Sequence, residues 1–157
     1  MKSTFRTLMA GLALAFAGVS MGANYQDADL KPTYGSVKLK SGFKDDPYVK
    51  DLEAGGPLKQ GKGRVPAYIG KEPDFILEYE AGKYALTIYA ESSADTTLLI
   101  KLPDGTWVAN DDGPGTGNNP LLRFQKPQSG KYTIWVGTIG AETAKAKLKI
   151  TELKVGK

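Results

Sequence analysis

Apolar and polar residues alternate with a period of two through much of the chain between residues 66 and 151. In one segment Phe75, Leu77 and Tyr79 occupy every second position, and residues 84–90 repeat the pattern. This is the spacing of side chains on one face of a β-strand. Turn-forming residues separate such segments every eight to twelve positions or so, which favours a β-sandwich or barrel. Further strands are expected at 35–43, 48–52, 98–102, 107–109, 121–124, 131–136 and 145–151.

The N-terminal residues have the pattern of an export signal. Lys2 and Arg6 precede an uncharged apolar run over 8–19, and small residues over 20–23 offer a cleavage site. The alternative is a membrane-spanning helix, but the run is shorter than the ~20 residues that a span requires. We therefore expect an exported protein, periplasmic or secreted, that is not an integral membrane protein.

Removal of residues 1–23 would leave 134 of the 157 residues, enough for one domain with a core. Residues 24–65 are expected to form an N-terminal arm, loose over 24–33, followed by the first strands. Residues 66–157 are expected to form the sandwich, in one domain with 35–65.

The chain contains no Cys and no His. Ser-His-Asp and Cys-His catalysis are therefore excluded, together with disulfides and the commonest metal ligand. The formal charge of +4 falls to +2 without Lys2 and Arg6, and the remaining basic residues form no cluster. This composition argues against nucleic-acid binding.

Lysines alternate with apolar residues near the C-terminus, at Lys145, Lys147 and Lys149. They could form a basic binding stripe, or they could protect an edge strand from pairing with other chains. We favour the second interpretation.

Acidic and amide side chains are concentrated between residues 95 and 119. Hard cations such as Ca²⁺ bind such oxygens, and the glycines at 113, 115 and 117 would let a loop curl around an ion. The alternative is that these residues build turns, as Asp104-Gly105 would between two strands. The candidate calcium ligands are Asp95, Asp104, Asn110, Asp111, Asp112, Asn118 and Asn119.

A catalytic use of the same residues is a further possibility. A glycosidase needs two facing carboxyl groups ~5–10 Å apart. Asp111 and Asp112 are adjacent, and on a strand they would point to opposite faces. The sequence therefore shows no catalytic pair.

Two tryptophans are candidates for ligand contact. Trp107 and Trp135 lie in predicted strands, and Trp135 is out of phase with Ile134 and Val136. An exposed Trp in an exported sandwich would suit a carbohydrate or peptide ligand. The alternative is that it covers the second face of its strand.

Several short motifs resemble the bacterial pre-peptidase C-terminal (PPC) domain over about residues 73–153. They are Asp95-Thr96-Thr97-Leu98, Pro103-Asp104-Gly105, Asn110-Asp111-Asp112-Gly113 and Ser129-Gly130-Lys131-Tyr132. A stand-alone exported subset is also similar in Gly42-Phe43 with Asp46-Pro47, Gly55-Gly56, Pro73-Asp74-Phe75 and Trp135-Val136-Gly137-Thr138. Two cysteines of that subset are replaced here by Val65 and Ala109.

The resemblance implies an antiparallel jelly-roll β-sandwich of about eight strands. It also implies an accessory or binding role rather than catalysis. Relatives in clostridial collagenases bind collagen and calcium, but the calcium-binding linker has no counterpart here. We thus expect an exported, non-catalytic module that binds a protein or an envelope or extracellular polymer, with calcium as its one candidate cofactor. The alternative is a secreted peptidase or glycan hydrolase that uses Asp residues or a carboxylate-held metal.

Overall fold

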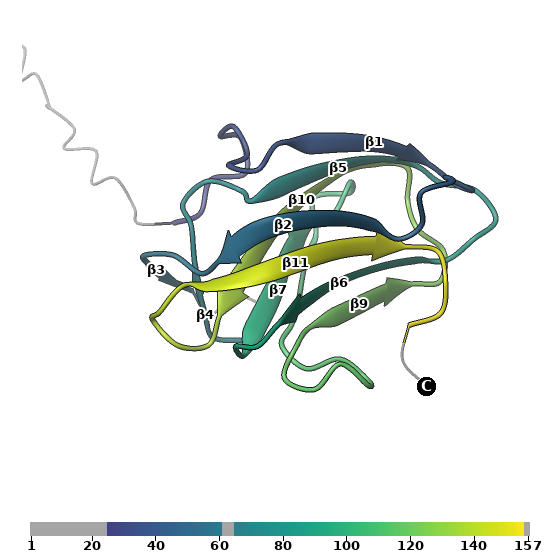
Figure 1. The fold of residues 1–157 in the computed structure, drawn as a ribbon. Helices are drawn as coiled ribbons and strands as arrows, with labels where there is room; N and C mark the ends of the chain where they lie inside the picture. Colours follow the sequence, from purple (N-terminus) through teal and green to yellow (C-terminus); the bar gives the residue numbers. More distant parts are fainter. Residues whose placement is uncertain (1–24, 61–64, 156–157) are drawn as a thin grey trace, which may run out of the picture.

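The computed structural model describes residues 25–60 and 65–155, and all regular elements in these ranges are strands (Figure 1). The predicted export signal over 1–23 lies outside them. Within the same ranges no helix is long and apolar enough to span a membrane. The strands are β1 (Ser36–Lys40), β2 (Tyr48–Ala54), β3 (Leu58–Gln60), β4 (Ala67–Ile69), β5 (Phe75–Glu80), β6 (Leu86–Ser92), β7 (Thr96–Lys101), β8 (Trp107–Asn110), β9 (Leu121–Phe124), β10 (Gly130–Thr138) and β11 (Ala144–Thr151).

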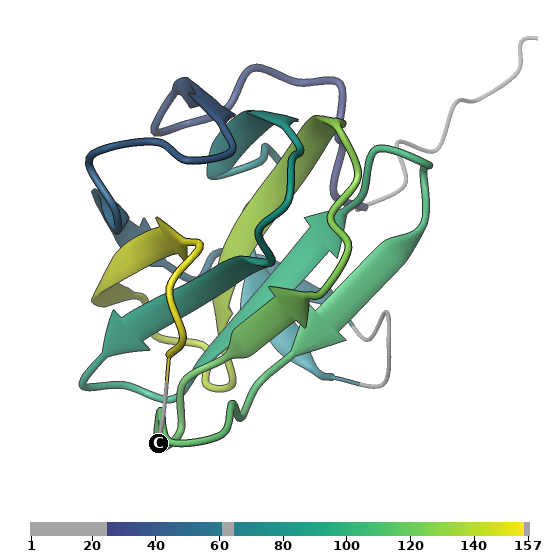
Figure 2. The same cartoon turned by 90° about the vertical axis from the view of Figure 1, so that its right-hand side faces the viewer.

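These strands form two packed sheets, which Figure 2 shows from the side. The seven-stranded sheet is built around β10, which pairs with β5, β4 and β7. The four-stranded sheet has the order β2-β11-β6-β9. The prediction of an all-β sandwich is confirmed, with the three-residue strands β3 and β4 among those not expected. One pair, β1 with β5, is parallel, whereas the sequence predicted antiparallel pairing throughout.

The main core lies between the two sheets and consists of the inward-facing alternate residues of both. Phe75, Leu77 and Tyr79 are all buried, while Glu78 and Glu80 between and after them are exposed, as the period of two predicted. The buried members are Leu52, Ala54, Phe75, Leu77, Tyr79, Leu86, Ile88, Ala90, Leu98, Ile100, Tyr132, Ile134, Val136, Ala146, Leu148 and Ile150.

A second, smaller apolar cluster is separate from the main core. Trp135 and Leu99 belong to it, and both alternate with main-core residues of the same strands, so they point to the outer face of the seven-stranded sheet. The buried members are Ala28, Ala67, Ile69, Leu99 and Trp135.

Residues 25–35, which we call the N-terminal strap, provide part of the cover of this cluster. Ala28 packs into it, and Gln26 is also buried. The backbone N–H of Asp27 donates to the carbonyl of Lys71, and that of Thr33 to the carbonyl of Pro73. The prediction of a loose arm over 24–33 is therefore wrong for the residues that the structure describes.

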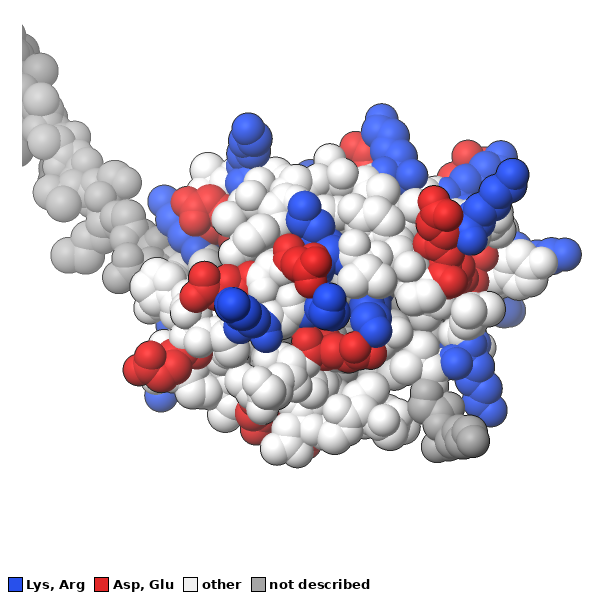
Figure 3. Space-filling model, in the orientation of Figure 1, with Lys and Arg blue, Asp and Glu red and all other residues white. Residues whose placement is uncertain are grey.

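The lysine-bearing strand β11 lies in the middle of the four-stranded sheet, between β2 and β6, so the prediction of an edge strand is also wrong. Lys147 pairs with Asp51 of β2 at 3.0 Å, and Lys149 pairs with Glu91 of β6 at 2.7 Å. Figure 3 shows the resulting face, on which basic and acidic side chains are interleaved.

Candidate functional site

The predicted calcium ligands do not lie at one place. Asp104 occupies the turn after β7, whereas Asp95 precedes β7, and six residues of strand separate them by ~20 Å. The Asp104 carboxylate accepts hydrogen bonds from the N–H and hydroxyl of Thr106 and from Nε2 of Gln128 at 2.8 Å. These bonds, led by that from the Thr106 hydroxyl, lower the pKa of Asp104 to about 2. Asp104 therefore builds a turn, as the second interpretation proposed.

The side chains of Asn110 and Asn119, two of the predicted calcium ligands, form hydrogen bonds within the protein. Oδ1 of Asn110 accepts the N–H of Leu121 at 2.8 Å, and its Nδ2 donates to the carbonyl of Asp112. Oδ1 of Asn119 accepts the hydroxyl of Thr96 at 2.6 Å, and its Nδ2 donates to the carbonyl of Ser92. These bonds attach the loop between β8 and β9 to the neighbouring strands.

Three carboxylates of the predicted set, those of Asp95, Asp111 and Asp112, lie near one another at the end of the sandwich where β7 begins. Burial raises the pKa of Asp95, and the charges of Asp112 and then Asp111 raise it further. The carboxylate of Asp111 accepts the N–H of Asp112, and Asn118 contributes a backbone carbonyl to the N–H of Thr96. Across residues 25–60 and 65–155, no group of three or more His, Cys, Asp or Glu side chains could hold a metal ion. Calcium binding thus stays a prediction.

The two tryptophans contact each other. Their ring centroids are 5.5 Å apart with an interplanar angle of 34°. Trp135 is fully buried in the second cluster and offers no surface to a ligand. The prediction that Trp135 is an exposed ligand-binding residue is therefore wrong. Trp107 is half-buried on β8, and its ligand contact stays a prediction.

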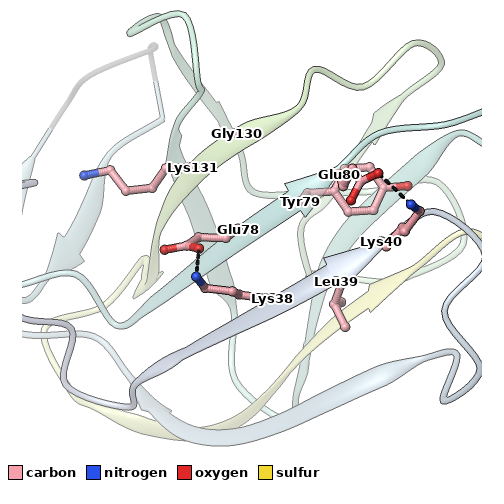
Figure 4. Close-up of a pocket in the computed structure, with 8 residues that line it drawn as sticks. All are labelled: Lys38, Leu39, Lys40, Glu78, Tyr79, Glu80, Gly130 and Lys131. Atoms are coloured by element: carbon pink, nitrogen blue, oxygen red, sulfur yellow. Dashed lines mark ion pairs between the residues drawn. The ribbon is translucent and has the colours of Figure 1, made fainter.

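A shallow groove of about 470 Å³ lies on the outer face of the seven-stranded sheet (Figure 4), where no sequence motif predicted a site. Three neighbouring strands line it: Lys38, Leu39 and Lys40 come from β1, Glu78, Tyr79 and Glu80 from β5, and Gly130 and Lys131 from β10. The alternation of charges in 38–40 and 78–80 was visible in the sequence. The parallel pairing of β1 with β5, which places the two rows side by side, was not.

Charges in this groove form rows across the strands. Lys38 pairs with Glu78 at 2.9 Å, and Lys40 pairs with Glu80 at 2.7 Å. Lys131 is the cross-strand neighbour of Glu78 on its other side, and takes part in none of the ion pairs found among the described residues. Three lysines thus face two glutamates, and the groove has an excess of positive charge.

The residue Tyr79 contributes its backbone to the groove, while its phenol points into the main core and is held in its neutral form. Burial raises the pKa of Tyr79, and its hydrogen bond to Oε1 of Glu152, at 2.5 Å, raises it further. Oε2 of the same glutamate accepts the N–H of Gly42 at 2.7 Å. Tyr79 and Glu152 therefore tie the C-terminal segment to the turn after β1, and neither is available as a nucleophile or base.

A second hollow, of about 420 Å³, lies on the outer face of the four-stranded sheet. Its lining includes Asp51, Glu91 and Lys147, which already form ion pairs across β2, β11 and β6. This face therefore presents balanced charges.

Comparison with known proteins leaves the family open. No protein-family model matches the chain, and no curated protein matches it. Among solved structures, PliG of Aeromonas hydrophila, a periplasmic lysozyme inhibitor of g-type lysozyme, is similar with 14% sequence identity. The match has a TM-score of 0.35 and covers 74% of this chain and 96% of that chain.

Proposed function

We propose that this chain is an exported, non-catalytic β-sandwich that binds a macromolecular partner through the groove on β1, β5 and β10. The observation that carries the proposal is the row formed by Lys38, Glu78 and Lys131, which is open to solvent and has an excess of positive charge. A broad, shallow, charged surface suits a protein or a polymer better than a small substrate, for which concave and mostly apolar pockets are usual.

The excess of lysine favours a partner with negative charge, either an acidic protein surface or an anionic envelope or extracellular polymer. Such charges steer association and set specificity more than they add affinity. The resemblance to the PPC domain agrees with an accessory role of this kind and is part of the proposal.

The proposal is tested by placing a photo-crosslinking amino acid at Lys131 and, as a matched control, at Lys145 on the opposite face. We expect a discrete crosslinked product in the exporting cells from position 131 only. The product should be lost when Lys38 and Lys40 are both changed to Glu. Equal crosslinking from both positions, or no product from 131, would contradict binding at the groove.

The hydrolase alternative is tested by assaying peptide and glycan substrates with Asp111→Ala and Asp112→Ala. Activity of the unchanged chain that disappears in both variants, with the fold intact, would overturn the non-catalytic proposal. A binding module should show no such activity.

A calcium-stabilised loop is a second candidate, because burial raises the pKa of Asp95 and the nearby charges of Asp112 and Asp111 add to that rise. A cation at ~100 times its dissociation constant would add about 2.7 kcal/mol of stability. Thermal melts with millimolar calcium and with a chelator measure this directly. Identical melting temperatures would reject the calcium candidate and leave the groove proposal unaffected.

A further inference from the structure

Strand β10 changes partner along one edge, and a buried carboxyl group fills the gap. Ile134 pairs with Phe75 of β5, and Thr138 pairs with Tyr68 of β4. Between them, the N–H of Val136 donates to Oδ2 of Asp74 at 2.7 Å. The Asp74 side chain thus supplies the acceptor that a neighbouring strand would otherwise provide.

The same residue anchors the end of the N-terminal strap. The N–H of Tyr34 donates to the carbonyl of Asp74 at 2.8 Å, and the N–H of Thr33 donates to the carbonyl of Pro73 at 2.9 Å. The N–H of Asp74 in turn donates to the carbonyl of Ile134. The strap and β10 therefore meet at Asp74.

The carboxyl group of Asp74 lies in surroundings that disfavour its charge. The residue is 5% exposed, and burial raises its pKa to about 7, against the opposing effect of the Val136 N–H. The chain has no His, so no imidazole titrates in the same range. None of the charged side chains on the surrounding segments contributes to the shift: Asp27, Asp29, Lys31, Glu53, Lys71, Glu72, Glu78, Glu80 and Lys131.

Before Thr33 the strap is attached by the bond from the N–H of Asp27 to the carbonyl of Lys71 and by the packing of Ala28. Gln26 is buried, and neither polar atom of its side chain has a hydrogen-bond partner. Nε1 of Trp135, in the cluster that the strap helps to cover, is also unpaired. An unpaired buried polar group is costly. Opening of the strap would let water pair with the Gln26 amide and the Trp135 N–H, and this gain would offset part of the free-energy cost of exposing Ala28.

We propose that Asp74 is a proton-operated latch: while its carboxyl group is neutral and buried against β10, the strap stays closed on the backbone carbonyls of Pro73 and Asp74, and the ionised form favours a locally open state in which water reaches the carboxylate. The sign follows from the raised pKa, because the closed state binds the proton more tightly. The closed state is favoured most strongly below pH 3.8, the ordinary pKa of an Asp carboxyl group. This preference weakens about tenfold per pH unit as the pH rises toward about 7, and is constant above that.

Amide hydrogen exchange measured by NMR between pH 4.5 and 8 tests the latch. After correction for intrinsic exchange, protection of the Thr33 and Tyr34 amides should fall about tenfold per pH unit up to pH 7. In Asp74→Asn, which keeps an acceptor for Val136 but cannot ionise, protection should be independent of pH. Glu72→Gln, which removes an exposed carboxyl two residues away, should behave like the unchanged chain.

Local opening also requires the strap amides to be less protected than those of Leu148 in the main core. Equal protection at every pH would mean that exchange occurs only through global unfolding, which would overturn the latch. A midpoint below pH 5 for the Asp74 carboxyl carbon in the unchanged chain would overturn it as well. This last measurement decides the question even if Asp74→Asn fails to fold.

Discussion

The two apolar clusters of this molecule differ in what covers them. The main core has a sheet on each side, whereas the second cluster has the seven-stranded sheet on one side and the strap as part of its cover on the other. In the main core the hydroxyl of Tyr132 donates to the carbonyl of Gln128 at 2.7 Å. On the outer face Thr97, Thr133 and Trp135 each have an unpaired polar atom.

The largest effect of this difference in cover is expected at two adjacent leucines of β7. Leu98 faces the main core and Leu99 faces the second cluster, and both are buried. We expect Leu98→Ala to lower the free energy of unfolding by about 4 kcal/mol and Leu99→Ala by about 2 kcal/mol, because the strap can collapse into the cavity. Urea unfolding measures both. Equal losses would show that the strap is as rigid a cover as a sheet.

A smaller effect is expected where the outer face is tightly packed. A Cβ at Gly137 would lie 2.5 Å from the hydroxyl oxygen of Thr97 and 2.8 Å from a methyl carbon of Ile69. Gly137→Ala should therefore destabilise the fold by about 2 kcal/mol. Gly140→Ala is the matched control, since no atom lies within 4 Å of its added Cβ. A Gly137→Ala variant with unchanged stability would show that this face adapts easily.

The smallest effect concerns two buried threonines. The Thr133 hydroxyl on the outer face has no partner, whereas the Thr96 hydroxyl donates to Asn119. Thr133→Val should leave stability unchanged or raise it slightly, and Thr96→Val should lower it by about 1 kcal/mol. The melting temperatures of the two variants give the comparison. A larger loss for Thr133→Val would mean that its hydroxyl is paired in solution.

The sequence was sufficient for features that depend on local periodicity. The inward positions of β5, the outward phase of Trp135 and the turn at Asp104 all follow from the alternation of residues or from turn chemistry. The position of β11 did not, because lysines at alternate positions look the same on an edge strand and on a central strand flanked by acids.

The groove and the strap could not be predicted for a related reason. The groove depends on β5 returning to lie parallel to β1 after three intervening strands, of which β2 belongs to the other sheet, and no local pattern encodes this pairing. Asp74 resembles any acidic residue before a strand, and its burial depends on the change of partner along β10. The loop acids were identified from the sequence, but their separation into two ends depends on the direction of β7.

The central position of β10 has a consequence for the order in which the chain can fold during synthesis. Strands β5, β4 and β7 all pair with β10, and strands β2 and β6 both pair with β11. Each sheet is therefore completed by one of the last two strands to be synthesised. Pairing between residues far apart in sequence is slow to form. A nascent chain that ends before residue 130 can therefore form only separate strand pairs, such as β1 with β5 and β6 with β9, and a stable fold must wait until nearly the whole chain has left the ribosome.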